Sequence, residues 1–154
     1  MPKIDFEPKL DFDQVLIRPK RSELNSRNEV DLTRTFRFKN GAMWTGVPVI
    51  AANMSTTGTF EIYQQLSQHK MLTALHKFYK PEHFKKFIDT YGEMNPDYFM
   101  ISTGISHADF ENLSNIASTI DFKWICIDIA NGYISKFLEF CKKVRNAFPN
   151  HIIV

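Results

Sequence analysis

Five short apolar runs divide the chain from residue 47 onward, and amphipathic segments separate them. The runs are VPVIAA (47–52), MLTALH (71–76), YFMIST (98–103), WICIDIA (124–130) and HIIV (151–154). They begin about 25 residues apart, a spacing typical of a strand followed by a helix. Near-continuous apolar strands that alternate with helices predict a parallel sheet covered by helices.

The separating segments carry apolar residues at helical spacing. Phe60, Tyr63 and Leu66 share one face of a helix expected over residues 59–68. Pro81 and Ser106 are typical first residues of two further helices. The last helix is the clearest, and its predicted apolar stripe consists of Ile134, Phe137, Leu138, Cys141 and Val144.

Residues 1–46 lack this repeat. They contain a polar and basic stretch, LIRPKRSELNSRNEVDLTR, and alternating residues that predict one short strand at Thr35–Lys39. We therefore interpret residues 1–46 as an N-terminal arm and residues 47–154 as one α/β domain.

Two parallel architectures fit the domain. An open, flavodoxin-like sheet has about this size. A (β/α)₈ barrel needs about 250 residues, but the run HIIV has no covering helix after it, which favours a partial barrel of four βα units and a fifth strand. No glycine-rich phosphate loop of the GxGxxG or GxxxxGK type occurs.

Composition excludes several classes of function. The chain has 44% hydrophobic and 23% charged residues and a net charge of +2, so neither nucleic acid nor a membrane is an expected partner. Without a leader or an apolar run of about 20 residues, we expect a soluble, cytoplasmic protein. Cys126 and Cys141 are expected to be core thiols, and the histidines show no metal-like spacing.

Polar residues follow the predicted strands where parallel α/β folds place their sites. Eight side chains are expected to ring this face: Asn53, Ser55, His76, Lys77, Ser102, Thr103, Asp128 and Asn131. Each alone could instead cap a helix or close a turn.

Asp128 is the most informative of them because it interrupts an apolar run. Strand alternation predicts that it shares a side with Trp124 and Cys126, and a buried carboxylate there would need a partner such as Lys77. The alternative is that Asp128 caps the following turn or helix.

Several segments, in order, resemble the GMP reductases of the IMP dehydrogenase/GMP reductase family. They are LDFDQVLIRPKRSELNSR, AANMSTTGTF, LTALHKFY, ISTG and CIDIANGY, and the resemblance covers about residues 8–154. The absence of an insert after His76-Lys77, and the NGY after IDIA, favour the reductase over IMP dehydrogenase. Two departures are NMST where the family usually has NMDT, and HKFY in place of HKHY.

The resemblance implies a tetrameric (β/α)₈ barrel that uses NADPH to convert GMP to IMP and ammonia. It implies a catalytic role for Lys77, and cofactor contacts for Lys77 and the segment Asp128, Ile129 and Ala130. Ser26 and Arg27 would reach the NADPH of a neighbouring subunit. We also expect six residues on the substrate side of the rim: Asn53, Met54, Ser55, Ser102, Thr103 and Asn131.

The catalytic cysteine and the potassium-binding loop of the family are expected beyond residue 154, since neither Cys126 nor Cys141 matches the nucleophile. We therefore expect this polypeptide to be inactive alone. Three alternatives remain at this point: an IMP dehydrogenase-like fragment, a non-catalytic half-barrel that binds a nucleotide or pairs with a separate half, and a flavodoxin-like domain.

Overall fold

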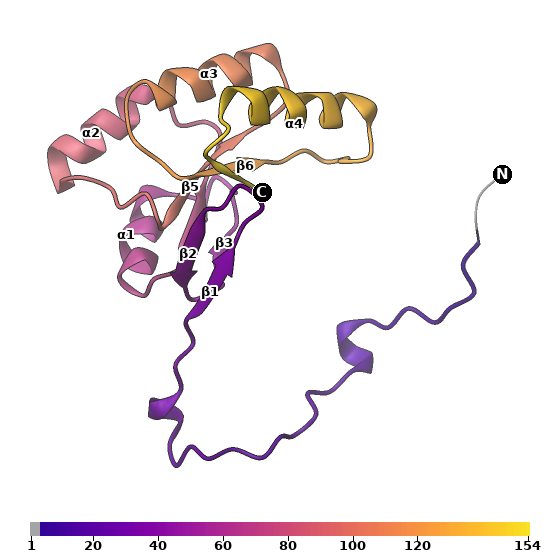
Figure 1. Cartoon of the computed structure of the whole chain (residues 1–154). Coiled ribbons are helices and arrows are strands. Elements are labelled where there is room, and N and C mark those ends of the chain that lie inside the picture. The colour runs from indigo at the N-terminus through magenta and orange to yellow at the C-terminus, as the bar shows by residue number, and fades with distance from the viewer. Residues whose placement is uncertain (1–3) are drawn as a thin grey trace. The chain divides into compact units, whose positions relative to one another are not determined.

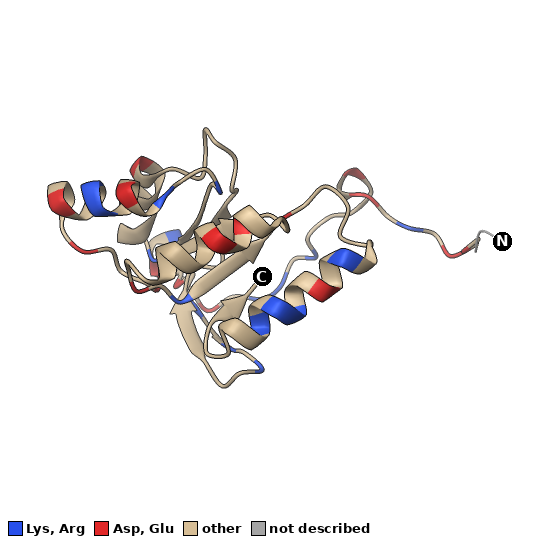
Figure 2. Cartoon of the chain, turned by 90° about the horizontal axis from the view of Figure 1, so that it is seen from above, with Lys and Arg blue, Asp and Glu red and all other residues tan. Residues whose placement is uncertain are grey.

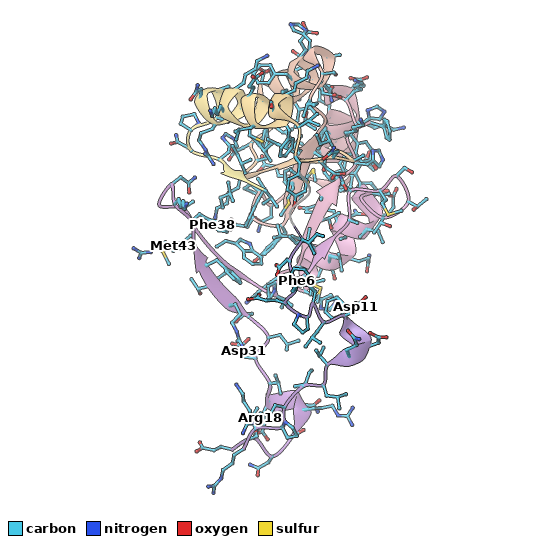
Figure 3. The ribbon with its side chains drawn as sticks, turned by 90° about the vertical axis from the view of Figure 1, so that its right-hand side faces the viewer. Phe6, Asp11, Arg18, Asp31, Phe38 and Met43 are labelled. Atoms are coloured by element: carbon cyan, nitrogen blue, oxygen red, sulfur yellow. The ribbon has the colours of Figure 1, made fainter. Side chains whose placement is uncertain are left out.

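A computed structural model describes residues 4–154, which form two units. The first unit ends at Asp31, and all its described residues are exposed. It contains two short 3-10 helices, η1 (Phe12–Gln14), capped by Asp11, and η2 (Arg27–Glu29). Arg18 lies on the irregular stretch between these helices (Figure 3).

The second unit, Leu32–Val154, contains a parallel sheet with a helix in each connection (Figure 1). The strands are β3 (Ile50–Ala51), β4 (Leu72–Leu75), β5 (Phe99–Thr103), β6 (Trp124–Ile127) and β7 (Ile152–Ile153). The helices are α1 (Phe60–Gln68), α2 (Pro81–Tyr91), α3 (His107–Ala117) and α4 (Ser135–Ala147). The predicted alternation of strands and helices is confirmed.

Strand order distinguishes the two candidate architectures. The five strands follow their chain order, β3-β4-β5-β6-β7, so every crossover adds the next strand on the same side. A flavodoxin-like sheet has the order 2-1-3-4-5 instead. The structure therefore confirms the partial (β/α)₈ barrel and excludes the flavodoxin-like alternative.

All four helices bury their apolar residues in one core on one side of the sheet. They contribute pairs of buried side chains: Phe60 and Tyr63, Phe84 and Phe87, Leu113 and Ile116, and Phe140 and Val144. The predicted stripe of α4 was partly wrong. Leu138 is 59% exposed, and Ile134 precedes the helix as its N-cap. Phe140, at the i+3 position from Phe137, is buried instead, because that spacing keeps it on the sheet-facing side.

A β-hairpin packs against the opposite side of the sheet, near the amino ends of its strands. Its strands are β1 (Arg34–Arg37) and β2 (Met43–Gly46), with Phe38 and Met43 flanking the turn (Figure 3). The sequence predicted the first strand but not the second. Trp44 of β2 packs edge-to-face on Trp124, with 5.6 Å between ring centroids, and its Nε1 donates to the Asp97 carbonyl at 2.9 Å.

The hairpin lies at the amino ends of the sheet strands. Trp44 shares a buried cluster with Leu72, Trp124 and Ile152, each the first residue of its strand. Lys123 links the hairpin to the amino ends of the strands. Its Nζ lies 2.7 Å from an Asp97 carboxylate oxygen and donates to the Met43 carbonyl at 2.8 Å. The carboxyl ends are thereby left to the loops after the strands.

Charge is distributed without a dominant sign in the described part of the chain. The helices differ in charge, however: α3 carries acidic residues and no Lys or Arg, whereas α4 carries four basic residues and one acidic residue (Figure 2). None of the helices in residues 4–154 is long and apolar enough to cross a bilayer.

Candidate functional site

A cavity of about 370 Å³ opens at the carboxyl ends of the strands. Loops after β3, β4 and β6 line it, with the residues Asn53, Lys77, Phe78, Asp128, Ile129 and Ala130. All of these except Phe78 are among the candidate site residues from the sequence. Parallel topology explains their meeting, because it brings successive carboxyl ends to one edge.

Asp128 is the first residue beyond β6. Its backbone N–H donates to the Thr103 carbonyl at 3.1 Å, which extends the ladder between β5 and β6 by one bond. Its carboxylate accepts a hydrogen bond from Asn53 Nδ2 at 3.1 Å. This bond closes the rim across the two strands that separate β3 from β6.

The expectation of a buried Asp128 paired with Lys77 was wrong. Asp128 is exposed, and none of the ion pairs found within residues 4–154 involves Lys77. The physical reason is that β6 ends at Ile127, so Asp128 has left the packed strand and meets the loop after β3 first. Both charges therefore remain available to a ligand in the cavity.

Lys77 lies in a tight turn at the end of β4. Lys77 and Phe78 are the two central residues, and the Tyr79 N–H closes the turn by donating to the His76 carbonyl at 3.3 Å. The Lys77 ammonium is exposed, 5.9 Å from the centroid of the Phe78 ring. Burial lowers the pKa of His76, so its imidazole is neutral at neutral pH.

Ser102 and Thr103 lie on opposite sides of β5. Thr103 is buried, and its Oγ1 can donate to the Gly104 carbonyl at 3.1 Å or to the carbonyl of Asp109 in α3 at 3.4 Å. Ser102 is paired in register with Cys126 on the side away from the helices. Adjacent residues of a strand point to opposite sides of the sheet. Thr103 points to the helix-covered side and therefore does not reach the rim.

The remaining candidates in the second unit, Met54, Ser55 and Asn131, do not line the cavity. Met54 and Ser55 are exposed on the loop after β3, and Asn131 Oδ1 accepts from the Tyr133 N–H at 3.1 Å. The turn-stabilising role considered for Asp128 thus belongs to Asn131. Ser26 caps η2 by accepting from the Asn28 N–H at 3.3 Å, and Arg27 begins that helix in the first unit.

The two thiols are poor nucleophiles. Burial raises the pKa of Cys126, which packs against the cluster around Trp44 and Trp124, and of Cys141, which packs on the helix-side core. Thiolate formation, on which nucleophilicity depends, is therefore disfavoured at both. No cluster of three metal-binding side chains occurs among residues 4–154.

The chain is similar in sequence to known proteins over its whole length. The model of the IMP dehydrogenase/GMP reductase domain matches residues 9–154. The whole chain aligns with GMP reductase 2 of Bos taurus at 49% identity, GMP reductase 1 of Mus musculus at 48% and a GMP reductase of Caenorhabditis elegans at 46%. The chain spans only 44–45% of the length of these relatives.

Among solved structures, inosine 5' monophosphate dehydrogenase from Legionella pneumophila has the same fold, with a TM-score of 0.73 at 22% identity. The alignment covers 92% of this chain and 42% of the dehydrogenase. The sequence match extends over almost all described residues and establishes the family. The structural match, at low sequence identity, establishes only the fold. The chain therefore belongs to the IMP dehydrogenase/GMP reductase family.

Proposed function

We propose that this chain functions in the NADPH-dependent reductive deamination of GMP to IMP and ammonia, in purine nucleotide interconversion. The observation that carries the proposal is the cavity that Asn53, Lys77 and the segment 128–130 line together. Identity of 46–49% to proteins named GMP reductase supports the choice of reaction.

The residues around the cavity fit a nicotinamide cofactor. The Lys77 ammonium can pair with a phosphate, and the Asp128 carboxylate, held by Asn53, can accept hydrogen bonds from ribose hydroxyls or an amide. Arg27 could bind the extra phosphate of NADPH bidentately if the first unit reaches the cofactor of a neighbouring subunit. NADPH supplies the hydride when bound.

The nucleophilic step of this reaction requires a cysteine that forms a thiolate readily. In the proposed reaction a cysteine thiolate would bond to C2 of GMP and the 2-amino group would leave as ammonia; hydride supplied by bound NADPH at C2 would then break the C2–S bond and release IMP and the thiolate. Cys126 and Cys141 are unsuited because burial raises the pKa of both thiols. We therefore propose that the 154-residue polypeptide binds cofactor but needs another segment for turnover, and we assign potassium no site in residues 4–154.

Cofactor titration tests the proposal directly. Fluorescence of NADPH, titrated with the purified chain, should show saturable binding, and Lys77→Ala should weaken it about tenfold. Lys85→Ala, an exposed lysine of α2 outside the cavity, is the matched control and should bind as the unmodified chain does. Absence of saturable binding, or equal weakening by both substitutions, would contradict the assignment of this cavity.

A non-catalytic pairing module is the second candidate. It is favoured by the outer strands of the sheet, β3 and β7, where Ile50 is 47% exposed and the adjoining Val49 and Val154 are 48% and 54% exposed. Unpaired strand edges with apolar side chains bind other strands. We propose tetrameric assembly and a cytoplasmic location together with the first candidate, since the resemblance implies both.

A further inference from the structure

The Lys77 turn is closed twice, once by backbone and once by side chains. The Tyr79 N–H donates to the His76 carbonyl at 3.3 Å across Lys77 and Phe78. The His76 and Tyr79 rings also stack, with centroids 3.9 Å apart and planes inclined by 16°. His76 and Tyr79, which flank the turn, are therefore joined both by a backbone hydrogen bond and by a ring stack.

Tyr79 is itself anchored to two helices. Its hydroxyl accepts a hydrogen bond from the Phe60 N–H at 3.3 Å, and the two rings lie 4.1 Å apart. Its carbonyl accepts from Asn112 Nδ2 of α3 at 3.0 Å. Tyr79 thus fixes the turn relative to α1 and α3.

His76 is held on the other side by close backbone approach. Its N–H donates to the Gly58 carbonyl at 2.9 Å. A Cβ at Gly58 would lie 2.2 Å from the Ala74 carbonyl oxygen, so only glycine permits this approach. The ring of His76 is half-buried, and its Nδ1 has no hydrogen-bond partner among the described atoms. The imidazole contacts two rings of the turn: it stacks on Tyr79 and lies 5.8 Å, between centroids, from the tilted Phe78 ring.

We infer that His76 and Tyr79 are positioning residues, whose stacked rings hold the Lys77 turn so that its ammonium faces the cofactor cavity. The inference rests on the proposed function, in which Lys77 contacts NADPH. It concerns a residue pair that touches no cofactor itself, because neither His76 nor Tyr79 lines the cavity.

A double-mutant cycle separates positioning from a general structural role. We expect His76→Ala to weaken NADPH binding about tenfold in the parent chain, and to have no further effect in a Lys77→Ala background. His76→Phe, which keeps a stacking ring, should restore at least most of the lost affinity. Equal effects of His76→Ala in both backgrounds, or no effect in the parent, would overturn the inference.

A second measurement remains valid if the chain binds no NADPH, an outcome that would refute the proposed function instead. Backbone ¹⁵N relaxation of the Lys77 and Phe78 amides should show rigid order parameters, about 0.85, in the parent chain. We expect values below about 0.6 in His76→Ala, smaller losses in Tyr79→Phe, which lacks only the hydroxyl, and recovery in His76→Phe. Unchanged order parameters in His76→Ala would overturn the positioning role.

Discussion

Asn53 and Asp128 are 75 positions apart in the chain, yet Asn53 Nδ2 donates to the Asp128 carboxylate at 3.1 Å. The bond joins the loops after β3 and β6 over the carboxyl ends of β4 and β5. The bond orients the Asp128 carboxylate but does not neutralise its negative charge, because the Asn53 amide is uncharged. A ligand in the cavity therefore meets an oriented carboxylate.

Removal of the Asp128 charge tests that orientation. Asp128→Asn keeps the size of the side chain but leaves one oxygen as acceptor, so we expect NADPH affinity to fall about tenfold, since hydrogen bonds to charged groups contribute about 1.5–3 kcal/mol. Asn53→Ala should cause a smaller loss, because the carboxylate remains but is no longer held. Calorimetric titration measures both. An Asn53→Ala effect larger than that of Asp128→Asn would contradict this order.

Binding and turnover should separate in this polypeptide. The purified chain, mixed with GMP and NADPH, should leave the near-ultraviolet absorbance of NADPH unchanged, because burial raises the pKa of the Cys126 and Cys141 thiols. The control is NADPH fluorescence in the same sample, which reports cofactor binding. Steady, GMP-dependent NADPH oxidation that survives Cys126→Ser and Cys141→Ser would show a different chemistry.

The stability of the fold should depend on Trp44, which packs between the hairpin and the sheet. Trp44 is 4% exposed, packs on Trp124 and donates from its indole nitrogen to the Asp97 carbonyl. Trp44→Ala should therefore lower the free energy of unfolding by about 3–5 kcal/mol in urea denaturation. Phe12→Ala, at a residue that is 93% exposed, is the control and should change it by less than about 0.5 kcal/mol.

Stability should fall on mild acidification. Burial lowers the pKa of His76 and of His151 below the ordinary 6.5, while Asp121 opposes and Arg145 reinforces the shift at His151. The unfolded chain then takes up protons first, so stability is complete above about pH 6.5 and decreases as the pH drops toward the folded-state pKa values.

Denaturant titrations over this pH range check the sign. His151→Phe removes one titrating ring but keeps an aromatic side chain against Phe122 and Phe148, so the acid-side loss should become smaller. A slope that is unaffected by His151→Phe would assign the acid sensitivity elsewhere.

Exposed sheet edges should cause association. Ile50 of β3 is 47% exposed on an outer strand, so we expect the chain to self-associate at micromolar concentration in sedimentation. Ile50→Lys should reduce association by adding a charge at the edge. Leu138→Lys on α4, where the parent residue is 59% exposed, should have less effect. A monodisperse monomer of the parent chain would contradict the prediction.

The sequence by itself determined the repeating unit of this protein. Strand and helix periodicities are local properties, so the five runs, the four helices and the residues that follow each strand could be identified without contacts. Parallel topology then placed Lys77 and Asp128 at one edge. Residues 1–46 gave no comparable signal beyond one strand, and β2, with the single buried indole of Trp44, was missed.

Only the tertiary structure decided which polar groups meet. Strand order excluded the open sheet because adjacency depends on crossovers, which no local pattern encodes. Asn53 rather than Lys77 contacts Asp128, and Thr103 faces α3, because strand ends and loop paths are set by hydrogen bonds between distant residues. The sequence thus named most residues of the cavity, whereas their pairing, and the ring stack beside Lys77, required the packed sheet.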